Sequence, residues 1–521
     1  MTRRKTLRKT KVGLIVSFLI FVLNTTVANS SQTISLNDEA YGWVYEQIDY
    51  LYSRGFLDGL HYGTKPYTAE EVAKAVRVAQ DKIDNQEIAS NWVDEYVVKR
   101  LEEEFAEDFQ SEETKANCEI NFSEKLTGES KEKPTYREKL RIGAGLKPNP
   151  HFSAYTRYII DEALAKDSSY TGKVWKGFAG DASQSYISFD LPNVSFYFGR
   201  DRLSWGQGRL SSLILSETAF PVDMLRLEGE WGILKFSSFT GVLSPMEIED
   251  STGTTHINRY LSGHRLSFAP CSWLQIGLSE TVLYGGENRN LELYYAIPFI
   301  WYHGVQLNEG RDDNTFLGLD LNLRPLHNLV FYGELLIDDI QIEKKQQGDK
   351  EPDELGFLGG VNLTNILLPG IEVNLEYQKI TNWTYNQAKP YNRYLHKNKT
   401  IGSSLGTDSD MLGASLSGWI VEGLRFGLSY SFGRQGQGRI DAPWDWPWLG
   451  TEGEYKEKFP TGVVEKKKIS SAYLEYDHHN RLRLRLFGKY ADICNEGNIE
   501  NNKESYKEGG VLFFCMLGGL R

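Results

Sequence analysis

The chain has 521 residues and a formal net charge of −12, and it is rich in aromatic residues and glycine but holds only 4 cysteines and 5 methionines. The acidic balance argues against nucleic acid as a partner. After residue 30 no apolar run reaches the roughly 20 residues that a membrane-spanning helix needs, which excludes a helical membrane protein.

The N-terminus has the organisation of an export signal. Basic residues crowd the first eleven positions, and Val12 to Leu23 form an apolar run of about twelve residues, the length of a signal-peptide core. Ala28 and Ser30 are small residues that suit cleavage. We therefore expect residues 1–30 to be a signal peptide and the mature chain to be exported.

Residues 31–109 predict three short helices. Apolar residues recur at helical spacing from Tyr41 to Tyr52, and Gly55 suits the end of that helix. Thr68 to Glu71 form a capping box that begins a second helix, and a third is expected near Ser90. Because helices this short depend on tertiary packing, we expect a periplasmic cap. Residues 110–135, dense in charge and poor in apolar side chains, predict a flexible linker.

From residue 136 to 521, segments of alternating apolar and polar residues follow one another. Clear examples are residues 139–146, 317–324, 371–377, 412–418, 424–432 and 482–487. Their length of about nine or ten residues is what a tilted strand needs to cross a bilayer. A soluble sandwich can show the same alternation, but export and the aromatic residues at strand ends favour a mainly β fold with a large antiparallel transmembrane barrel. The spacing gives about 16 to 18 strands.

The stretch from Val194 to Glu230 combines two strand-like segments with an arginine-rich, glycine-rich middle. It resembles the signature of the Wzi family of capsule-assembly outer-membrane proteins, in which Gly-x-x-x-x-x-Trp-Gly-x-Gly precedes a Ser-Leu-Ile-Leu-Ser-like strand and an Ala-x-Pro turn. Here the element runs from Gly199 to Gly208. The helical region and residues 298–303 and 332–339 also carry the resemblance. It implies eighteen strands and a surface lectin in the outer membrane that holds or assembles capsular or related polysaccharide.

A long polar gap at residues 433–468 holds the candidate polysaccharide site. Its residues are Trp444, Trp446, Trp448, Asp441 and Asp445. Indole rings stack on the apolar faces of sugars while carboxylates accept hydroxyl protons, and exposed tryptophans are otherwise unfavourable. The alternative is an interfacial girdle or a loop packed into the barrel mouth.

Three arginines and a tryptophan of the signature form the second candidate cluster: Arg200, Arg202, Trp205 and Arg209. Guanidinium groups can hold the carboxylates of an acidic polysaccharide. We favour instead an internal salt-bridge network that occludes the channel. Its expected acids are Asp320, Glu334, Glu372 and Glu376. Asp338 and Asp339 are adjacent in a strand and point to opposite faces, so they form no carboxylate dyad by themselves.

The sequence shows no nucleophile-elbow motif and no metal-ligand spacing of cysteines, so we expect no enzyme, cofactor or metal. Cys494 and Cys515 can form a disulfide in an oxidising compartment or remain free. The expected partners are capsular or extracellular polysaccharide and outer-membrane lipid. The alternatives are a diffusion porin whose N-terminal module tethers it to the cell wall, and an outer-membrane hydrolase. The sugar, the open or plugged state of the pore and the oligomeric state stay open.

Overall fold

The structure is a computed structural model that describes residues 32–36, 38–105, 115–129, 134–167, 170, 172–250, 253–340, 350–452 and 455–517. The expected signal peptide, residues 1–30, lies outside them. In these ranges no helix combines the length and the apolar character needed to cross a membrane.

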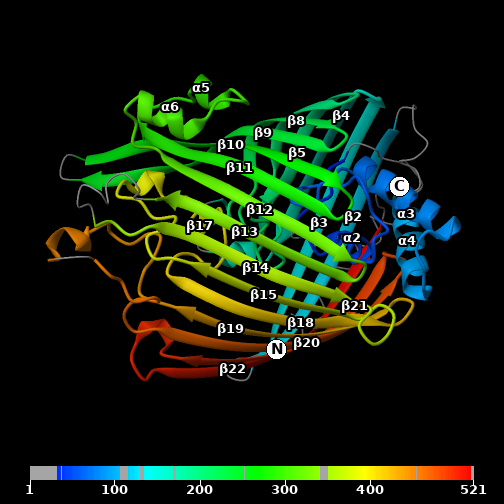
Figure 1. Ribbon diagram of the computed structural model, residues 1–521. Coiled ribbons are helices and arrows are strands. Elements are labelled where there is room, and N and C mark those ends of the chain that lie inside the picture. Colours follow the sequence, from blue (N-terminus) through cyan, green and yellow to red (C-terminus); the bar gives the residue numbers. More distant parts are fainter. Residues whose placement is uncertain are drawn as a thin grey trace.

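Within the described ranges, eighteen antiparallel strands close into one barrel (Figure 1). Each strand pairs with its neighbour along the chain, and the first pairs with the last to close the wall. The strands are β2 (Lys115–Glu129), β3 (Thr135–Asn149), β4 (Phe152–Asp161), β5 (Ala179–Leu191), β6 (Val194–Asp201), β8 (Val222–Trp231), β9 (Leu234–Asp250), β10 (Gly253–Cys271), β11 (Leu274–Glu287), β12 (Asn314–Leu326), β13 (Leu329–Asp339), β14 (Glu354–Thr364), β15 (Glu372–Ile380), β18 (Ser409–Val421), β19 (Leu424–Gln435), β20 (Glu465–His478), β21 (Leu482–Cys494) and β22 (Lys503–Met516). The predicted barrel is confirmed, with the larger of the expected strand numbers.

The barrel wall has an apolar outer face and a polar inner face. On β12, Leu317 and Leu321 are exposed while Asp320 and Asn322 are buried. Side chains of a strand alternate between its two faces, and apolar residues outside with polar residues inside are the pattern of a transmembrane barrel. The four cysteines are free, and Cys494 and Cys515 lie at opposite ends of β21 and β22.

The linker predicted for residues 110–135 is wrong over residues 115–129, because these residues form β2, the first strand of the barrel. Every second polar side chain from Asn117 to Ser123, including Glu119 and Asn121, is buried on the lumen side. A strand whose charged side chains face a polar lumen has an amino-acid composition similar to that of a solvated linker. The sequence alone therefore did not distinguish a strand from a linker here.

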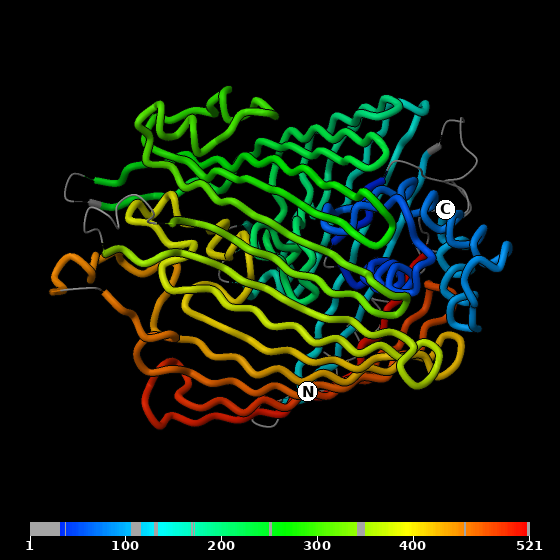
Figure 2. Tube along the Cα trace, in the orientation of Figure 1, coloured from blue at the N-terminus to red at the C-terminus, as the bar shows by residue number. Residues whose placement is uncertain are grey.

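The three predicted helices are present as α2 (Gly42–Arg54), α3 (Ala69–Asp84) and α4 (Trp92–Phe105). Gly55 ends α2 with a left-handed backbone, and the capping box between Thr68 and Glu71 begins α3. Residues 32–36 and 38–68 enter the barrel: Tyr52 Oη donates to Asn322 Oδ1 at 2.8 Å. Helices α3 and α4 lie past the strand ends, on the side of the short turns (Figure 2). The N-terminal region is therefore both a plug in the lumen and a cap over one end.

Two other segments between strands leave the simple hairpin pattern. Residues 202–221 turn into the lumen, where β7 (Ser204–Trp205) pairs with β1 (Thr64–Lys65). Residues 288–313 carry α5 (Leu293–Ala296) and α6 (Tyr302–Asn308), which lie over the outside of β10 and β11 (Figure 1). The short strands β16 (Leu395–His396) and β17 (Lys399–Thr400) form a hairpin in the loop after β15.

Candidate functional site

The signature segment and the N-terminal plug meet inside the barrel. Trp205 is fully buried and lies opposite Thr64 in a two-stranded sheet. Its ring meets Phe239 of the wall edge-on at 5.4 Å between centroids, and the N–H of Gly206 donates to Gly63 O at 3.0 Å. Two of the parts of the chain that carry the family resemblance, the N-terminal region and the signature segment, thus meet in the lumen.

Two carboxylates of the wall hold the backbone of the signature segment. Glu334 accepts hydrogen bonds from the N–H groups of Gln207 and Gly208 at 2.6 Å each, and from Leu213 at 2.7 Å. Glu376 accepts from the N–H groups of Arg209 at 2.7 Å and Leu210 at 3.2 Å. Buried N–H groups need such acceptors, since an unpaired one costs about 1 to 3 kcal/mol.

The two glycines of the motif are needed because the backbone of this turn lies so close to its neighbours. Gly206 has a φ of 133°, in the range that favours glycine, and a Cβ there would collide with the Glu334 carboxylate. A Cβ on Gly208 would lie 2.5 Å from the carbonyl oxygen of Ser211. The Trp-Gly-x-Gly element is therefore required by a turn whose backbone touches the lumen wall.

The salt-bridge network predicted for the signature arginines is wrong in its partners. Arg200 shares the outer face of Phe196 and Phe198, and its Nε lies 2.6 Å from Asp223 Oδ1 on β8. Arg202 Nη1 donates to the carbonyl oxygens of Glu217 and Ala219. Burial lowers the pKa of Arg202.

Arg209 does face the lumen, but its Nη1 donates to the Asn362 amide oxygen at 3.1 Å. The expected acids Asp320 and Glu372 pair instead with Arg265 and Arg425 of the wall. These partners lie far along the chain, which is why spacing did not reveal them. A cavity of about 400 Å³ remains between α2, the signature segment and the wall near Arg209.

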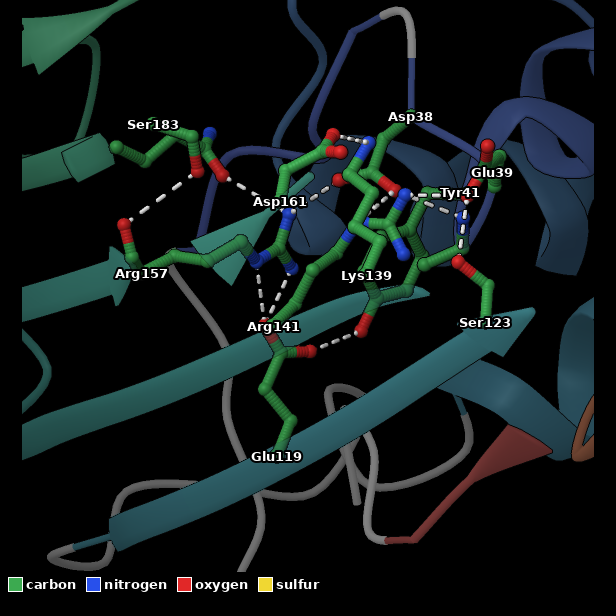
Figure 3. A network of polar contacts seen from close by, with 12 residues as sticks. Asp38, Glu39, Tyr41, Glu119, Ser123, Lys139, Arg141, Arg157, Asp161 and Ser183 are labelled. Atoms are coloured by element: carbon green, nitrogen blue, oxygen red, sulfur yellow. Dashed lines mark hydrogen bonds and ion pairs between the residues drawn. The ribbon is translucent and has the colours of Figure 1, made fainter. Parts of the chain in front are cut away.

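A buried ion network anchors the plug to β2, β3 and β4 (Figure 3). Arg141 and Arg157 are fully buried and contact Asp38 at 3.2 and 3.3 Å. Arg157 also pairs with Glu119 at 2.5 Å, and Tyr41 Oη donates to the same carboxylate at 2.7 Å. Burial raises the pKa of Asp38, but the two guanidinium groups outweigh it and hold the pKa well below its usual range.

The loop between β15 and β18 closes over the signature segment from the long-loop end. Tyr385 and Tyr394 are buried and stacked, with centroids 5.6 Å apart, and Tyr394 Oη donates to Ile214 O at 2.8 Å. Asp338 anchors this loop, because its Oδ2 accepts the N–H of Tyr385 at 2.6 Å. Asp339 lies opposite Glu354 on β14. Sequence reasoning missed Tyr385 and Tyr394, which follow no motif.

The three tryptophans of the predicted polysaccharide site do not form one platform. Trp444 and Trp448 meet Trp383 of the neighbouring loop edge-on, at 4.9 and 5.4 Å between centroids, and Trp448 is buried. Trp446 is 47% exposed and has a left-handed backbone. Asp441 and Asp445 are exposed on the same loop. Trp383 supports this loop by packing against Trp444 and Trp448. The sequence did not reveal this role, because Trp383 lies in a different loop.

These features define a transmembrane barrel whose lumen is filled by its own N-terminal segment and by an inward-folded loop. The chain belongs to the Wzi family: the family model described as "Capsule assembly protein Wzi" matches residues 104–505. A comparison with curated proteins found no match.

Among solved structures, the chain is similar to the outer membrane protein Wzi of Escherichia coli, a carbohydrate binding β-barrel involved in group 1 capsule assembly. The two are 15% identical, and the match covers 93% of this chain and 99% of that chain with a TM-score of 0.62. Weaker matches include OccD3 of Pseudomonas aeruginosa (12% identity, 77% of this chain, 91% of that chain, TM-score 0.44) and OccAB1 of Acinetobacter baumannii (11%, 77%, 96%, 0.45). At 15% identity, the likeness to the Escherichia coli barrel shows the fold.

Proposed function

We propose that this protein is a surface lectin of the outer membrane that binds capsular or related polysaccharide in the attachment or assembly of a capsule. Family membership supports the capsule role. The observation that carries the binding role is the exposed indole of Trp446, on a loop where the rings of Trp383, Trp444 and Trp448 pack together. A rigid aromatic face offers large contact area at low entropic cost.

The polar groups around Trp446 complete a sugar-binding surface. Asp441 and Asp445 are exposed on the same loop and offer acceptors for sugar hydroxyl groups. Arg393 fixes the start of the loop by donating to the carbonyl oxygens of Asp441 and Ala442 at 2.9 and 2.7 Å. The site is thus preorganised at the end of the barrel with the long connections, which we assign to the cell exterior.

The alternative of a diffusion porin requires an open lumen. The plug, the signature segment and the loop after β15 meet in the lumen, through contacts such as that of Ser216 N with Ile401 O at 3.0 Å. This packing favours a closed barrel.

The test is binding of the producer's own polysaccharide to purified full-length protein by surface plasmon resonance. Trp446→Ala should weaken binding about two- to tenfold, the range for one lost aromatic contact. Trp273→Ala is the matched control, because Trp273 is 48% exposed at the short-turn end, and it should leave binding unchanged. Equal binding by Trp446→Ala and the unaltered protein would remove this loop from the site.

A further inference from the structure

The outer face of β19 to β22 changes from apolar to aromatic and then to cationic side chains toward the long-loop end. Leu428, Leu474 and Leu486 are exposed on the face that meets lipid, and Tyr430 and Tyr490 follow on the same face. Aromatic residues in this position mark the boundary between hydrocarbon and headgroups. Because side chains on one face recur at every second position, the residues beyond the tyrosines lie at headgroup height.

Cations gather on this face from the level of the tyrosines outward, with Lys507 directly opposite Tyr490. We call them the outer cationic band: Arg434 on β19, Lys466 and Lys468 on β20, and Lys503 and Lys507 on β22. The four lysines are exposed. Asp410 and Asp492 are the acids on the same stretch of wall, so cations outnumber acids there by five to two in a chain of net charge −12.

The register of the strands brings these charges together. Arg434 lies directly opposite Lys466, and Lys466 and Lys503 flank Cys494 from either side. With strands about 4.8 Å apart, Lys466 and Lys503 are about 10 Å from each other. Like charges in opposite positions destabilise a sheet, unless an anion between them offsets the repulsion.

Two acids lie opposite cations of this band. Arg434 is held by Asp410, whose Oδ1 lies 2.9 Å from its Nε, and Tyr377 donates to the same carboxylate at 3.0 Å. Asp492 lies opposite Lys468. The band as a whole still has a positive excess, on rigid strands and on the side of the wall that faces the membrane.

We propose that the outer cationic band binds the phosphate groups of a phosphorylated lipid in the outer leaflet. A headgroup phosphate at this height meets several cations at once, and each basic side chain near a charged membrane surface adds to the attraction. An acidic polysaccharide bound at the loops would meet other side chains, because these residues lie on strands and outside the lumen. The proposal is independent of the lectin function.

The test compares binding of bis-phosphorylated lipid A and of its dephosphorylated form to full-length protein by native mass spectrometry. Unaltered protein should prefer the phosphorylated form, and the preference should weaken as salt rises. Changing Lys466, Lys468, Lys503 and Lys507 together to Gln should weaken binding of the phosphorylated form at least about tenfold. The double variant Lys466→Gln and Lys503→Gln should give an intermediate loss.

The matched control is the double variant Lys467→Gln and Lys489→Gln. These lysines sit on β20 and β21 but face the lumen, where Lys467 pairs with Glu465 at 3.4 Å and Lys489 lies over Tyr506. The control should bind lipid as the unaltered protein does. Equal affinity for both lipid forms, an equal loss in the control, or a loss of polysaccharide binding with lipid binding intact would each overturn the proposal.

Discussion

Glu334 in the barrel wall accepts a hydrogen bond from the backbone N–H of Gly208 at 2.6 Å. One carboxylate thereby joins β13 to the turn that fills the centre of the lumen, and it holds two further N–H groups of the same turn. Glu334 thus holds the turn inside the lumen through three hydrogen bonds.

Replacing Glu334 with Ala should free residues 204–216. Three buried N–H groups lose their acceptor, at a cost of about 1 to 3 kcal/mol each. Hydrogen exchange of this segment should therefore accelerate, and planar bilayers should show a conductance that the unaltered protein lacks. Glu334→Gln keeps one acceptor oxygen and should have a smaller effect. Unchanged exchange in Glu334→Ala would show that other contacts hold the turn.

Replacing Asp38 with Asn should loosen the plug in a pH-dependent way. Arg141 and Arg157 keep the pKa of Asp38 depressed in the folded protein, so its contribution is fully present above about pH 5 and is lost as the pH falls below the unfolded value of about 4. Breaking a buried pair costs about 3 to 5 kcal/mol. Proteolysis of residues 32–54 should be faster in Asp38→Asn at pH 7.

The difference between Asp38→Asn and the unaltered protein should shrink as the pH is lowered from 5. Asp49→Asn is the control, because Asp49 on α2 makes no ion pair with the described residues. A difference that stays constant with pH would contradict the role of the Asp38 carboxylate.

The sequence predicted what depends on local periodicity. Alternation gave strands such as those around Leu319 and Leu428, and the capping box at Thr68 gave the start of α3. Sequence-based prediction failed for side chains whose interaction partners lie far away along the chain. The position of Arg200 on the outer face follows from the parity of Phe196 and Phe198, but its charge suggested the lumen.

The candidate site shows the same limit. The alternation of Trp444, Trp446 and Trp448 suggested three equivalent rings. Trp383, 61 residues before Trp444, packs against Trp444 and Trp448 and leaves the ring of Trp446 exposed. Strand β2 was missed because charged side chains such as Glu119 and Lys125 face the lumen and give the segment the composition of a linker. Neither fact follows from neighbouring residues, since both depend on how the barrel closes.

Trp448→Ala should act differently from Trp446→Ala. Trp448 is buried against Trp383 and Trp444, and removing a buried tryptophan costs about 3 to 5 kcal/mol. We expect faster proteolysis of residues 436–452 and weaker polysaccharide binding together. Trp446→Ala should weaken binding with the loop still protected. Equal protection of the loop in both variants would contradict the supporting role of Trp448.

Glu280→Ala should release the helical segment of residues 288–313 from the outer wall. Glu280 is buried, and its carboxylate accepts the N–H groups of Tyr302 and His303 at 3.0 and 2.9 Å, at the start of α6. Loss of both bonds should speed hydrogen exchange in α6, while exchange of the luminal segment 204–216 stays unchanged. Glu287→Ala, at the exposed end of β11, is the control. An α6 that stays protected would show that its aromatic contacts suffice.

The central claim is that a closed barrel of this family binds the polysaccharide of the cell that makes it. Isothermal titration of the purified full-length protein with that polysaccharide, beside an unrelated glycan of similar charge, measures this directly. The account predicts saturable binding to the cell's own polysaccharide only. Heats that match simple dilution for every surface glycan of that cell would contradict it.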